Sequence, residues 1–194
     1  MSAVPGARRA VFLDRDGTLN REIGYIGDPE DLVLLSGVEG ALRRLMGAGY
    51  ELVVVSNQSA IGRGVLSAER VAAVNARLLA FLAAEGVPIA GLFVCPHAPD
   101  DACDCRKPEP GLVLQARDQL GLDLATSWLV GDSAKDVAAA RAAGVRPLLV
   151  LTGWGKRDRE AALADGLAAD DVVADLAAAA DRILASGRAG SESA

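Results

Sequence analysis

Two aspartates, Asp14 and Asp16, directly follow the short apolar segment of residues 10–13. An apolar run without polar alternation fits a strand that is covered on both faces, as in a parallel sheet. Ligands bind outside the carboxyl ends of such strands, and Gly17 lets the chain turn so that both carboxylates face one space. Adjacent carboxylates repel each other unless a cation or a proton lies between them. The pair therefore suggests a reaction site, and the alternative is a strand end followed by a polar turn.

Polar side chains also follow three further predicted strands, at residues 51–55, 89–94 and 127–130. In a parallel sheet such strand ends meet at one edge, so the side chains should converge on one crevice. Singly, each side chain has another explanation as a turn residue, a solvated loop charge or a helix cap. Together they suit the binding of a phosphate group. The candidate residues are Ser56, Asn57, Gln58, Ser59, Arg106, Lys107, Asp132, Ser133 and Asp136.

Strands and helices alternate along the chain. Apolar residues at helical spacing predict helices over residues 38–46, from Ser67 to near Gly86, and over residues 110–120 and 134–143, and a fifth strand follows at residues 147–151. Ser67 is the expected N-cap of the second helix. This alternation predicts an α/β fold with a doubly wound, mostly parallel sheet and helices on both faces.

The chain of 194 residues is long enough for one domain with a substantial core. We expect a single domain over residues 8–186 and a flexible, Gly- and Ser-rich tail over residues 187–194. Hydrophobic residues make up 51% of the chain and aromatic residues only 4%. The core should therefore consist mainly of Ala, Val and Leu side chains, which suits helices packed on a sheet.

The formal net charge is −6 and the chain has no basic run, which argues against nucleic acid or an anionic membrane as the main partner. No apolar stretch is long enough to span a bilayer, and residues 1–9 lack the apolar core of a signal peptide. We therefore expect a cytoplasmic protein that acts on a small molecule. Because no apolar surface stripe calls for a partner, a monomer is the default expectation.

A second candidate metal site contains the chain's one histidine and all three of its cysteines, namely Cys95, His97, Cys103 and Cys105. Three thiolates and one imidazole match a closed tetrahedral zinc site, and the intervening loop is long enough to fold the second pair back on the first. A closed ligand set indicates a structural role. The alternatives are a redox-active pair or unrelated buried thiols.

The ordered motifs carry a resemblance to a known family. The segment Phe12–Thr18, then Ser56, Lys107 and the segment Gly131–Asp136 resemble the motif set of haloacid dehalogenase-like phosphatases. This resemblance implies a Rossmann-like fold in which Asp14 attacks phosphorus to form an aspartyl-phosphate. It also implies that Asp16 protonates the leaving oxygen and then activates water.

The same resemblance implies a bound Mg²⁺, held by the carboxylates of Asp14 and Asp132 and by the main-chain carbonyl of Asp16. Ser56 and Lys107 would bind the oxygens of the transferring phosphate group. Asp136 would either support the metal through water or orient Lys107, and the sequence leaves both roles open.

Phosphatases of this kind often carry a large cap domain, but the segments between the motifs leave no room for one. The loops at residues 22–27 and 95–105 are therefore expected to set specificity. The motifs around Asp14, Gly24, Ser56 and the cysteine cluster are similar to those of the D-glycero-D-manno-heptose 1,7-bisphosphate phosphatase family, and the short loop between His97 and Cys103 resembles the related histidinol-phosphate phosphatases.

Membership of the heptose family would imply removal of the 7-phosphate from a small phosphorylated sugar. Arg106, whose forked guanidinium suits phosphate, would hold the phosphate that is retained. The residues expected to bind substrate are Arg15, Glu22, Ile23, Gly24, Tyr25, Asn57, Gln58, Ser59, Arg106 and Ser133.

Two other classes of protein share parts of this pattern. A signalling receiver domain also phosphorylates an aspartate in a parallel sheet with Mg²⁺, but its phosphoacceptor belongs to a middle strand, whereas Asp14 follows the first. A zinc-stabilised binding module without catalysis is the other alternative, although no residue that catalysis requires is missing. Repeated phosphate release in the presence of Mg²⁺ would separate an enzyme from both.

Overall fold

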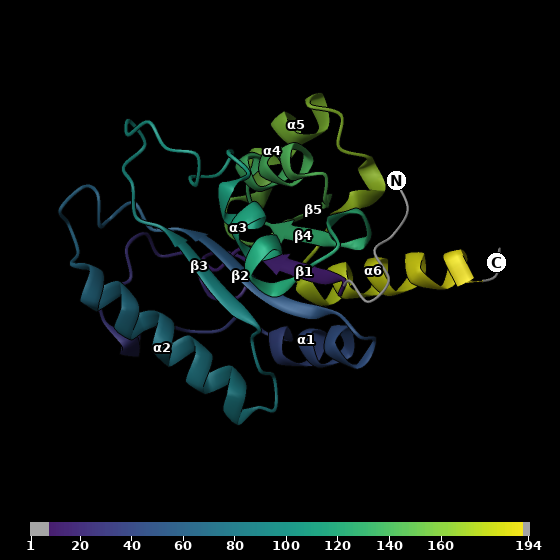
Figure 1. The fold of residues 1–194 in the computed structure, drawn as a ribbon, viewed down its shortest axis with the longest axis horizontal. Helices are drawn as coiled ribbons and strands as arrows, with labels where there is room; N and C mark the ends of the chain where they lie inside the picture. Colours follow the sequence, from purple (N-terminus) through teal and green to yellow (C-terminus); the bar gives the residue numbers. More distant parts are fainter. Residues whose placement is uncertain (1–7, 192–194) are drawn as a thin grey trace.

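The computed structural model describes the backbone of residues 8–191 and shows six parallel strands in one sheet within that range. Their order across the sheet is β3-β2-β1-β4-β5-β6. This arrangement confirms the predicted α/β fold (Figure 1). The strands are β1 (Ala10–Leu13), β2 (Glu51–Asn57), β3 (Gly91–Cys95), β4 (Trp128–Gly131), β5 (Arg146–Val150) and β6 (Val172–Val173).

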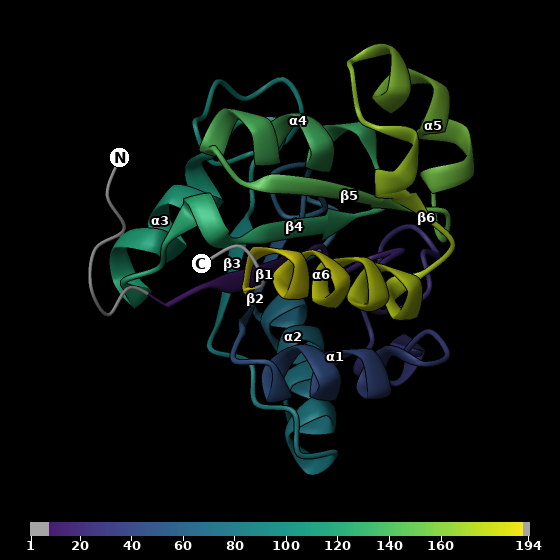
Figure 2. The same cartoon turned by 90° about the vertical axis from the view of Figure 1, so that its right-hand side faces the viewer.

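Helices cover both faces of the sheet (Figure 2). On one face, α1, α2 and α6 pack against Val11 and Leu13. On the other, α3 and α4 pack against Ala10 and Phe12. All four residues of β1 are fully buried because each face of the strand is covered, as its uninterrupted apolar sequence predicts. The helices are α1 (Val38–Gly47), α2 (Ala68–Ala84), α3 (Gly111–Leu120), α4 (Ala134–Ala143), α5 (Gly155–Ala164) and α6 (Leu176–Ser191).

The register of the central strands brings their carboxyl ends level. Leu13 is opposite Val54 of β2 and Val130 of β4. The backbone N–H of Asp14 then donates to the carbonyl of Val130 at 2.9 Å. The residues that follow β1, β2 and β4 therefore lie at one edge of the sheet, as predicted.

The connections at this edge are loops with one short 3-10 helix, η1 (Pro29–Asp31), and within residues 8–191 none of them forms a large cap domain. This agrees with the expectation that the segments between the motifs leave no room for a large cap. Two more 3-10 helices, η2 (Leu124–Thr126) and η3 (Ala169–Asp171), precede β4 and β6.

Most predicted elements agree with the structure to within two residues, and Ser67 caps α2 by accepting a hydrogen bond from the N–H of Arg70 at 3.3 Å. The strand β6 and the helices α5 and α6 were not predicted. The structure continues α6 to Ser191, whereas the sequence predicted a tail from residue 187. Ser186 does not break the helix, since its hydroxyl donates to the carbonyl of Ile183 at 2.7 Å within the helix. Residues 192–194 lie outside the described residues.

None of the helices in the described part of the chain is both long enough and apolar enough to cross a membrane.

Candidate active site

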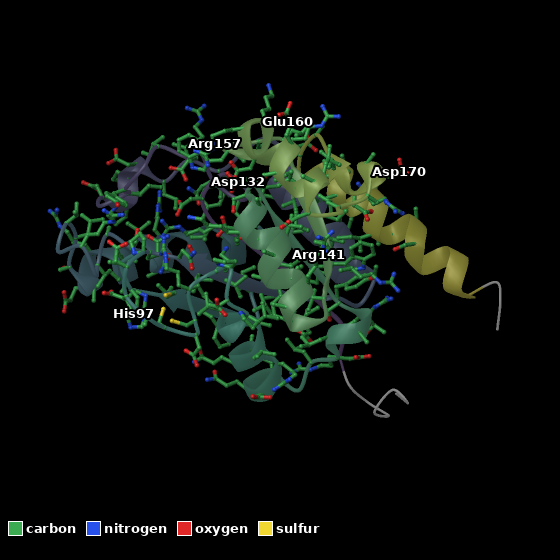
Figure 3. The ribbon with its side chains drawn as sticks, turned by 90° about the horizontal axis from the view of Figure 1, so that it is seen from above. His97, Asp132, Arg141, Arg157, Glu160 and Asp170 are labelled. Atoms are coloured by element: carbon green, nitrogen blue, oxygen red, sulfur yellow. The ribbon has the colours of Figure 1, made fainter. Side chains whose placement is uncertain are left out.

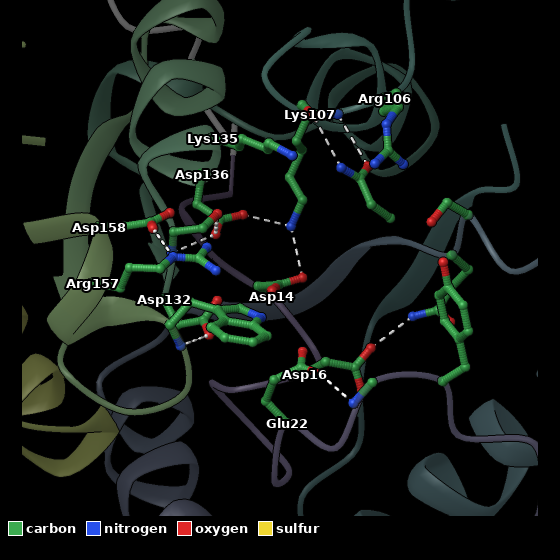
Figure 4. A pocket seen from close by; sticks show the side chains of 17 residues that line it. Asp14, Asp16, Glu22, Arg106, Lys107, Asp132, Lys135, Asp136, Arg157 and Asp158 are labelled. Carbon is green, nitrogen blue, oxygen red and sulfur yellow. Dashed lines mark hydrogen bonds and ion pairs between the residues drawn. The ribbon is translucent and has the colours of Figure 1, made fainter. Parts of the chain in front are cut away.

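A cavity of about 390 Å³ opens at the carboxyl ends of the strands (Figure 4). Side chains from loops far apart in the sequence meet there, as the sequence predicts. The predicted residues that line the cavity are Asp14, Asp16, Glu22, Gly24, Tyr25, Asn57, Gln58, Ser59, Arg106, Lys107, Asp132, Ser133 and Asp136.

Lys107 occupies the centre of the site and is only 3% exposed. Its Nζ lies 2.7 Å from Asp14 Oδ1 and 2.6 Å from Asp136 Oδ1, and it donates to the carbonyl of Val55 at 2.8 Å. These two carboxylates raise the pKa of Lys107 although its burial opposes this. The ammonium group therefore stays charged and is in direct contact with Asp14.

Asn57 fixes the loop that carries Lys107. Its side-chain oxygen accepts from the Lys107 N–H at 3.0 Å, and its amide nitrogen donates to the Lys107 carbonyl at 3.0 Å. This paired contact joins the end of β2 to a residue 50 positions later. Asn57 lines the cavity, but both polar atoms of its side chain are occupied by this backbone contact.

Three carboxylates gather beside Lys107. Asp14, Asp132 and Asp136 each place one oxygen within 4.8 Å of the others. Burial and the neighbouring carboxylates raise the pKa of Asp14 to about 7 and that of Asp132 to about 8. With one lysine against three carboxylates, the group favours a bound cation, and hard oxygen ligands suit Mg²⁺.

Two glycines allow Asp132 to lie close to the turn that follows Asp14. A Cβ atom on Gly17 would lie 2.0 Å from Asp132 Oδ2, and one on Gly153 would lie 1.9 Å from it. Gly17 also has a φ of +82°, which other residues rarely adopt. Asp132 Oδ2 accepts from the Trp154 N–H at 2.7 Å. The turn after Asp14 and the turn after β5 therefore close around one carboxylate.

Asp136 contacts Lys107 directly. Its other oxygen, Oδ2, accepts from the N–H of Ser133 at 3.1 Å and from the Ser133 hydroxyl at 2.6 Å, which completes a capping box at the start of α4. Of the two roles left open for Asp136, the structure shows the contact that orients Lys107.

Three residues expected to contact the substrate do not line the cavity. Arg15 is 1% exposed, and its guanidinium faces Asp16 and Asn75, because a buried cation needs polar partners. Ser56 is buried, and its hydroxyl accepts from Gln58 Nε2 at 2.9 Å. Ile23 is 56% exposed and lies outside the cavity lining. Contact of these three residues with the substrate therefore stays a prediction, and the structure does not place them in the cavity lining.

The prediction from sequence omitted Lys135, Trp154, Arg157 and Asp158, which also line the cavity. Arg157 stacks on the Trp154 ring at 4.2 Å and pairs with Asp158 at 2.7 Å. A signal was available, because the fifth strand was predicted and its carboxyl end lies at the same edge of the sheet. The turn Gly153-Trp154-Gly155 follows that strand, and Trp154 is 45% exposed.

The four zinc-ligand candidates come together at the end of β3 and in the loop that follows it, and Figure 3 shows sulfur atoms beside His97. His97 Nδ1 lies 3.2 Å from Cys105 Sγ and 3.5 Å from Cys95 Sγ. The Cys95 sulfur lies 3.1 Å from that of Cys105 and 3.9 Å from that of Cys103. A tetrahedral zinc site has ligand-to-ligand edges of about 3.3–3.8 Å, so this set could hold zinc.

Arg106 and the cysteine cluster are linked, because Arg106 Nη1 donates to the carbonyl of His97 at 3.3 Å. Without a cation, burial and the neighbouring thiols raise the pKa of Cys105 to about 12. A divalent ion would offset the repulsion between thiolates and order the loop that carries Arg106 and Lys107.

The fold, together with the carboxylates and lysine at one sheet edge, defines a haloacid dehalogenase-like hydrolase, and residues 104–179 match the HAD-hydrolase-like family model. The chain is 44% identical over 166 residues to the D-glycero-beta-D-manno-heptose-1,7-bisphosphate 7-phosphatase of Vibrio cholerae, covering 81% of this chain and 89% of that protein. The chain belongs to the D-glycero-beta-D-manno-heptose-1,7-bisphosphate 7-phosphatase family and is a phosphatase.

Two further comparisons agree with this assignment. The 7-phosphatase of the same name from Pseudomonas aeruginosa is 40% identical over 179 residues, covering 92% of this chain and 99% of that protein. The crystal structure of the D,D-heptose 1,7-bisphosphate phosphatase from B. bronchiseptica, complexed with magnesium and phosphate, superposes with a TM-score of 0.82 at 36% identity. That match covers 92% of this chain and 99% of the other.

Proposed function

We propose that this enzyme removes the 7-phosphate of D-glycero-beta-D-manno-heptose 1,7-bisphosphate through an aspartyl-phosphate on Asp14. The observation that carries the proposal is the buried contact of 2.7 Å between Asp14 and Lys107, beside Asp132 and at the edge of a sheet of this family. The names of the relatives support the substrate.

In the first step, an Asp14 oxygen forms a bond to phosphorus as the bond from phosphorus to the sugar oxygen breaks. Asp16 gives its proton to that leaving oxygen. In the second step, Asp16 takes a proton from a water molecule that attacks phosphorus, and the bond to Asp14 breaks to release phosphate. Lys107 stabilises the negative charge on the transferring group. The Ser56 hydroxyl, which accepts from Gln58 Nε2, keeps its own proton to donate to this group.

Asp14 and Asp132, with the main-chain carbonyl of Asp16, are the residues that would hold Mg²⁺. The three adjacent carboxylates and the raised pKa values of Asp14 and Asp132 fit a divalent cation. When bound, Mg²⁺ neutralises charge, so that a carboxylate can approach a phosphate dianion. The relative crystallised with magnesium and phosphate supports this assignment.

Cationic side chains in the cavity lining support a bisphosphate as the substrate. Besides Lys107, the cavity is lined by Arg106, Lys135 and Arg157. We assign the retained phosphate to Arg106, because its forked guanidinium suits two phosphate oxygens. Glu22, Gly24, Tyr25, Gln58, Ser59 and Ser133 are the remaining lining residues that we propose to contact the sugar or its phosphates.

Cys95, His97, Cys103 and Cys105 are proposed to hold a structural zinc ion. The support is the chemistry of the set and its compactness, since three thiols and one imidazole offer no open position. Zinc in this loop would keep Arg106 and Lys107 in place, because both directly follow Cys105.

Histidinol phosphate is the second candidate substrate, favoured by the short loop between His97 and Cys103. Its amino group is positive, however, whereas Arg106 at the cavity suits a second phosphate. The test is a comparison of kcat/KM for the two substrates with Mg²⁺. We expect the heptose bisphosphate to be preferred by at least about tenfold, since a charged hydrogen bond contributes that much to binding. Preference for histidinol phosphate would overturn the assignment.

A further inference from the structure

We propose that Arg15 and Asn75 are positioning residues that hold the carboxylate of Asp16 in place for proton transfer. This inference rests on the proposed phosphatase chemistry of Asp16. It assigns a role in the reaction to a residue of helix α2 and changes the role of Arg15 from substrate binding to support.

The guanidinium of Arg15 binds the carboxylate of Asp16, the next residue in the chain. Its Nη2 lies 2.8 Å from Asp16 Oδ2 and 3.0 Å from Oδ1, and its Nε lies 3.1 Å from Oδ1. The guanidinium is fully buried, so water does not compete for these contacts. A buried charge of this kind is stable only when it is paired, and its paired carboxylate is the group that must move a proton.

The rest of the Asp16 carboxylate is also held. Asn20 Nδ2 donates to Oδ1 at 2.9 Å, and Gln58 Nε2 donates to Oδ2 at 2.8 Å. Donors therefore surround both oxygens. The carboxylate cannot rotate about its side-chain bonds without losing several hydrogen bonds at once.

Asn75 anchors the outer end of Arg15, since its Oδ1 accepts from Arg15 Nη1 at 2.7 Å. Asn75 is 7% exposed and lies on the inward stripe of α2 with Val71, Val74 and Leu78. An amide on the apolar face of a helix requires a buried partner, and Arg15 is that partner. Helix α2 lines no part of the cavity, but Asn75 and Arg15 connect it by hydrogen bonds to the carboxylate of Asp16.

Loss of Arg15 should therefore impair only the proton transfer that Asp16 carries out. Displacement of a reacting group by about 1 Å can lower a rate by about 100-fold. If Arg15 acts through Asp16, its loss slows release of a strongly basic leaving group, which needs a proton. Loss of Arg15 has little effect on release of a weakly basic one.

The test compares kcat/KM of Arg15→Met toward heptose bisphosphate and 4-nitrophenyl phosphate, because kcat/KM includes departure of the leaving group. We expect a loss of about 100-fold for the sugar phosphate and of about threefold or less for the aryl phosphate. Equal losses for both substrates would overturn the proposal. Arg43→Met, which removes an exposed ion pair with Glu85, is the matched control and leaves both values unchanged.

A double variant supplies a second criterion. In an Asp16→Ala background, Arg15→Met should lower kcat/KM by no more than about twofold, because the group through which it acts is gone. A loss as large as in the wild-type background contradicts the proposal. If Arg15→Met does not fold, Asn75→Ala replaces it, with an expected loss of about tenfold confined to the sugar phosphate. Equal loss with both substrates, or none, overturns the proposal in that case.

Failure of the proposed function is distinguishable from failure of this inference. If the wild-type enzyme hydrolyses the aryl phosphate but not heptose bisphosphate, the substrate assignment is wrong. Any alkyl phosphate that the enzyme does hydrolyse then takes its place in the same comparison.

Discussion

The ammonium group of Lys107 lies 2.6 Å from Asp136 Oδ1, and both side chains are almost fully buried. Asp136 uses both of its oxygens, since Oδ1 forms the ion pair with Lys107 and Oδ2 accepts from Ser133. A carboxylate can do this, but an amide has only one accepting atom. An asparagine at position 136 therefore cannot serve both Lys107 and Ser133.

Asp136→Asn should place an NH₂ group against a donor, either Lys107 or Ser133. We expect the free energy of unfolding to fall by about 2 kcal/mol, the typical value of a hydrogen bond to a charged group. We also expect kcat to fall, because Lys107 loses its second carboxylate. Urea denaturation and steady-state assays measure the two effects, with the exposed Asp31→Asn as the control. Unchanged stability would show that this contact contributes nothing.

Asp14→Asn should lower kcat by about 10³-fold or more, because the variant lacks the nucleophile. The fold should be retained, since the Asp14 side chain contributes little apolar packing. A phosphate-release assay with Mg²⁺ and a thermal melt provide the measurements. Substantial activity in a folded variant would refute the assignment of Asp14.

Stability without added Mg²⁺ should fall as pH rises from about 4 to about 8. Asp14 and Asp132 have pKa values near 7 and 8 in the folded protein against an ordinary value of 3.8, so the folded state binds more protons in this range. The stabilisation is fully present below pH 4 and is lost as these groups ionise. Urea midpoints at pH 5.5 and 8.5 measure the slope.

Added Mg²⁺ should raise the midpoint at pH 8.5 most, and Asp132→Asn should flatten the slope. A midpoint that rises with pH would contradict the prediction.

Cys103→Ser should lower the melting temperature and leave kcat of the folded enzyme largely unchanged, as expected for a structural metal ligand. We expect the melting temperature to fall by about 5 °C or more, which corresponds to roughly 2 kcal/mol in a chain of this size. Zinc content and melting curves of wild type and variant give the measurement. Equal stability of the wild-type protein with and without bound zinc would count against a zinc site.

Arg106→Met should raise KM for the bisphosphate by about tenfold or more, because a charged contact to the retained phosphate is lost. KM for a monophosphate that lacks this group should change little. The ratio of the two KM values separates a lost contact from general damage to the site. An equal rise for both substrates would assign Arg106 to the transferred phosphate or to loop structure.

Positions next to a motif were the least predictable from sequence. Arg15 stands between Asp14 and Asp16 and was expected to face the substrate, but its side chain turns inward to Asn75. The cue was the amide on the apolar stripe of α2, which has meaning only once its partner is known. The monomeric state, the cytoplasmic location and the domain limits of residues 8–186 stay predictions.

The sequence alone determined the alternating fold, the strand ends that carry Asp14, Ser56 and Asp132, and the set of cysteine and histidine ligands. These depend on local periodicity, on the ends of buried strands and on rare residue types, all of which are visible along the chain. Only the tertiary structure decided that Asp136 pairs with Lys107, that Trp154 and Arg157 enter the cavity, and that Arg15 supports Asp16. Those contacts join residues from different loops and helices, and local pattern does not specify the direction in which a side chain points when several polar partners lie within reach.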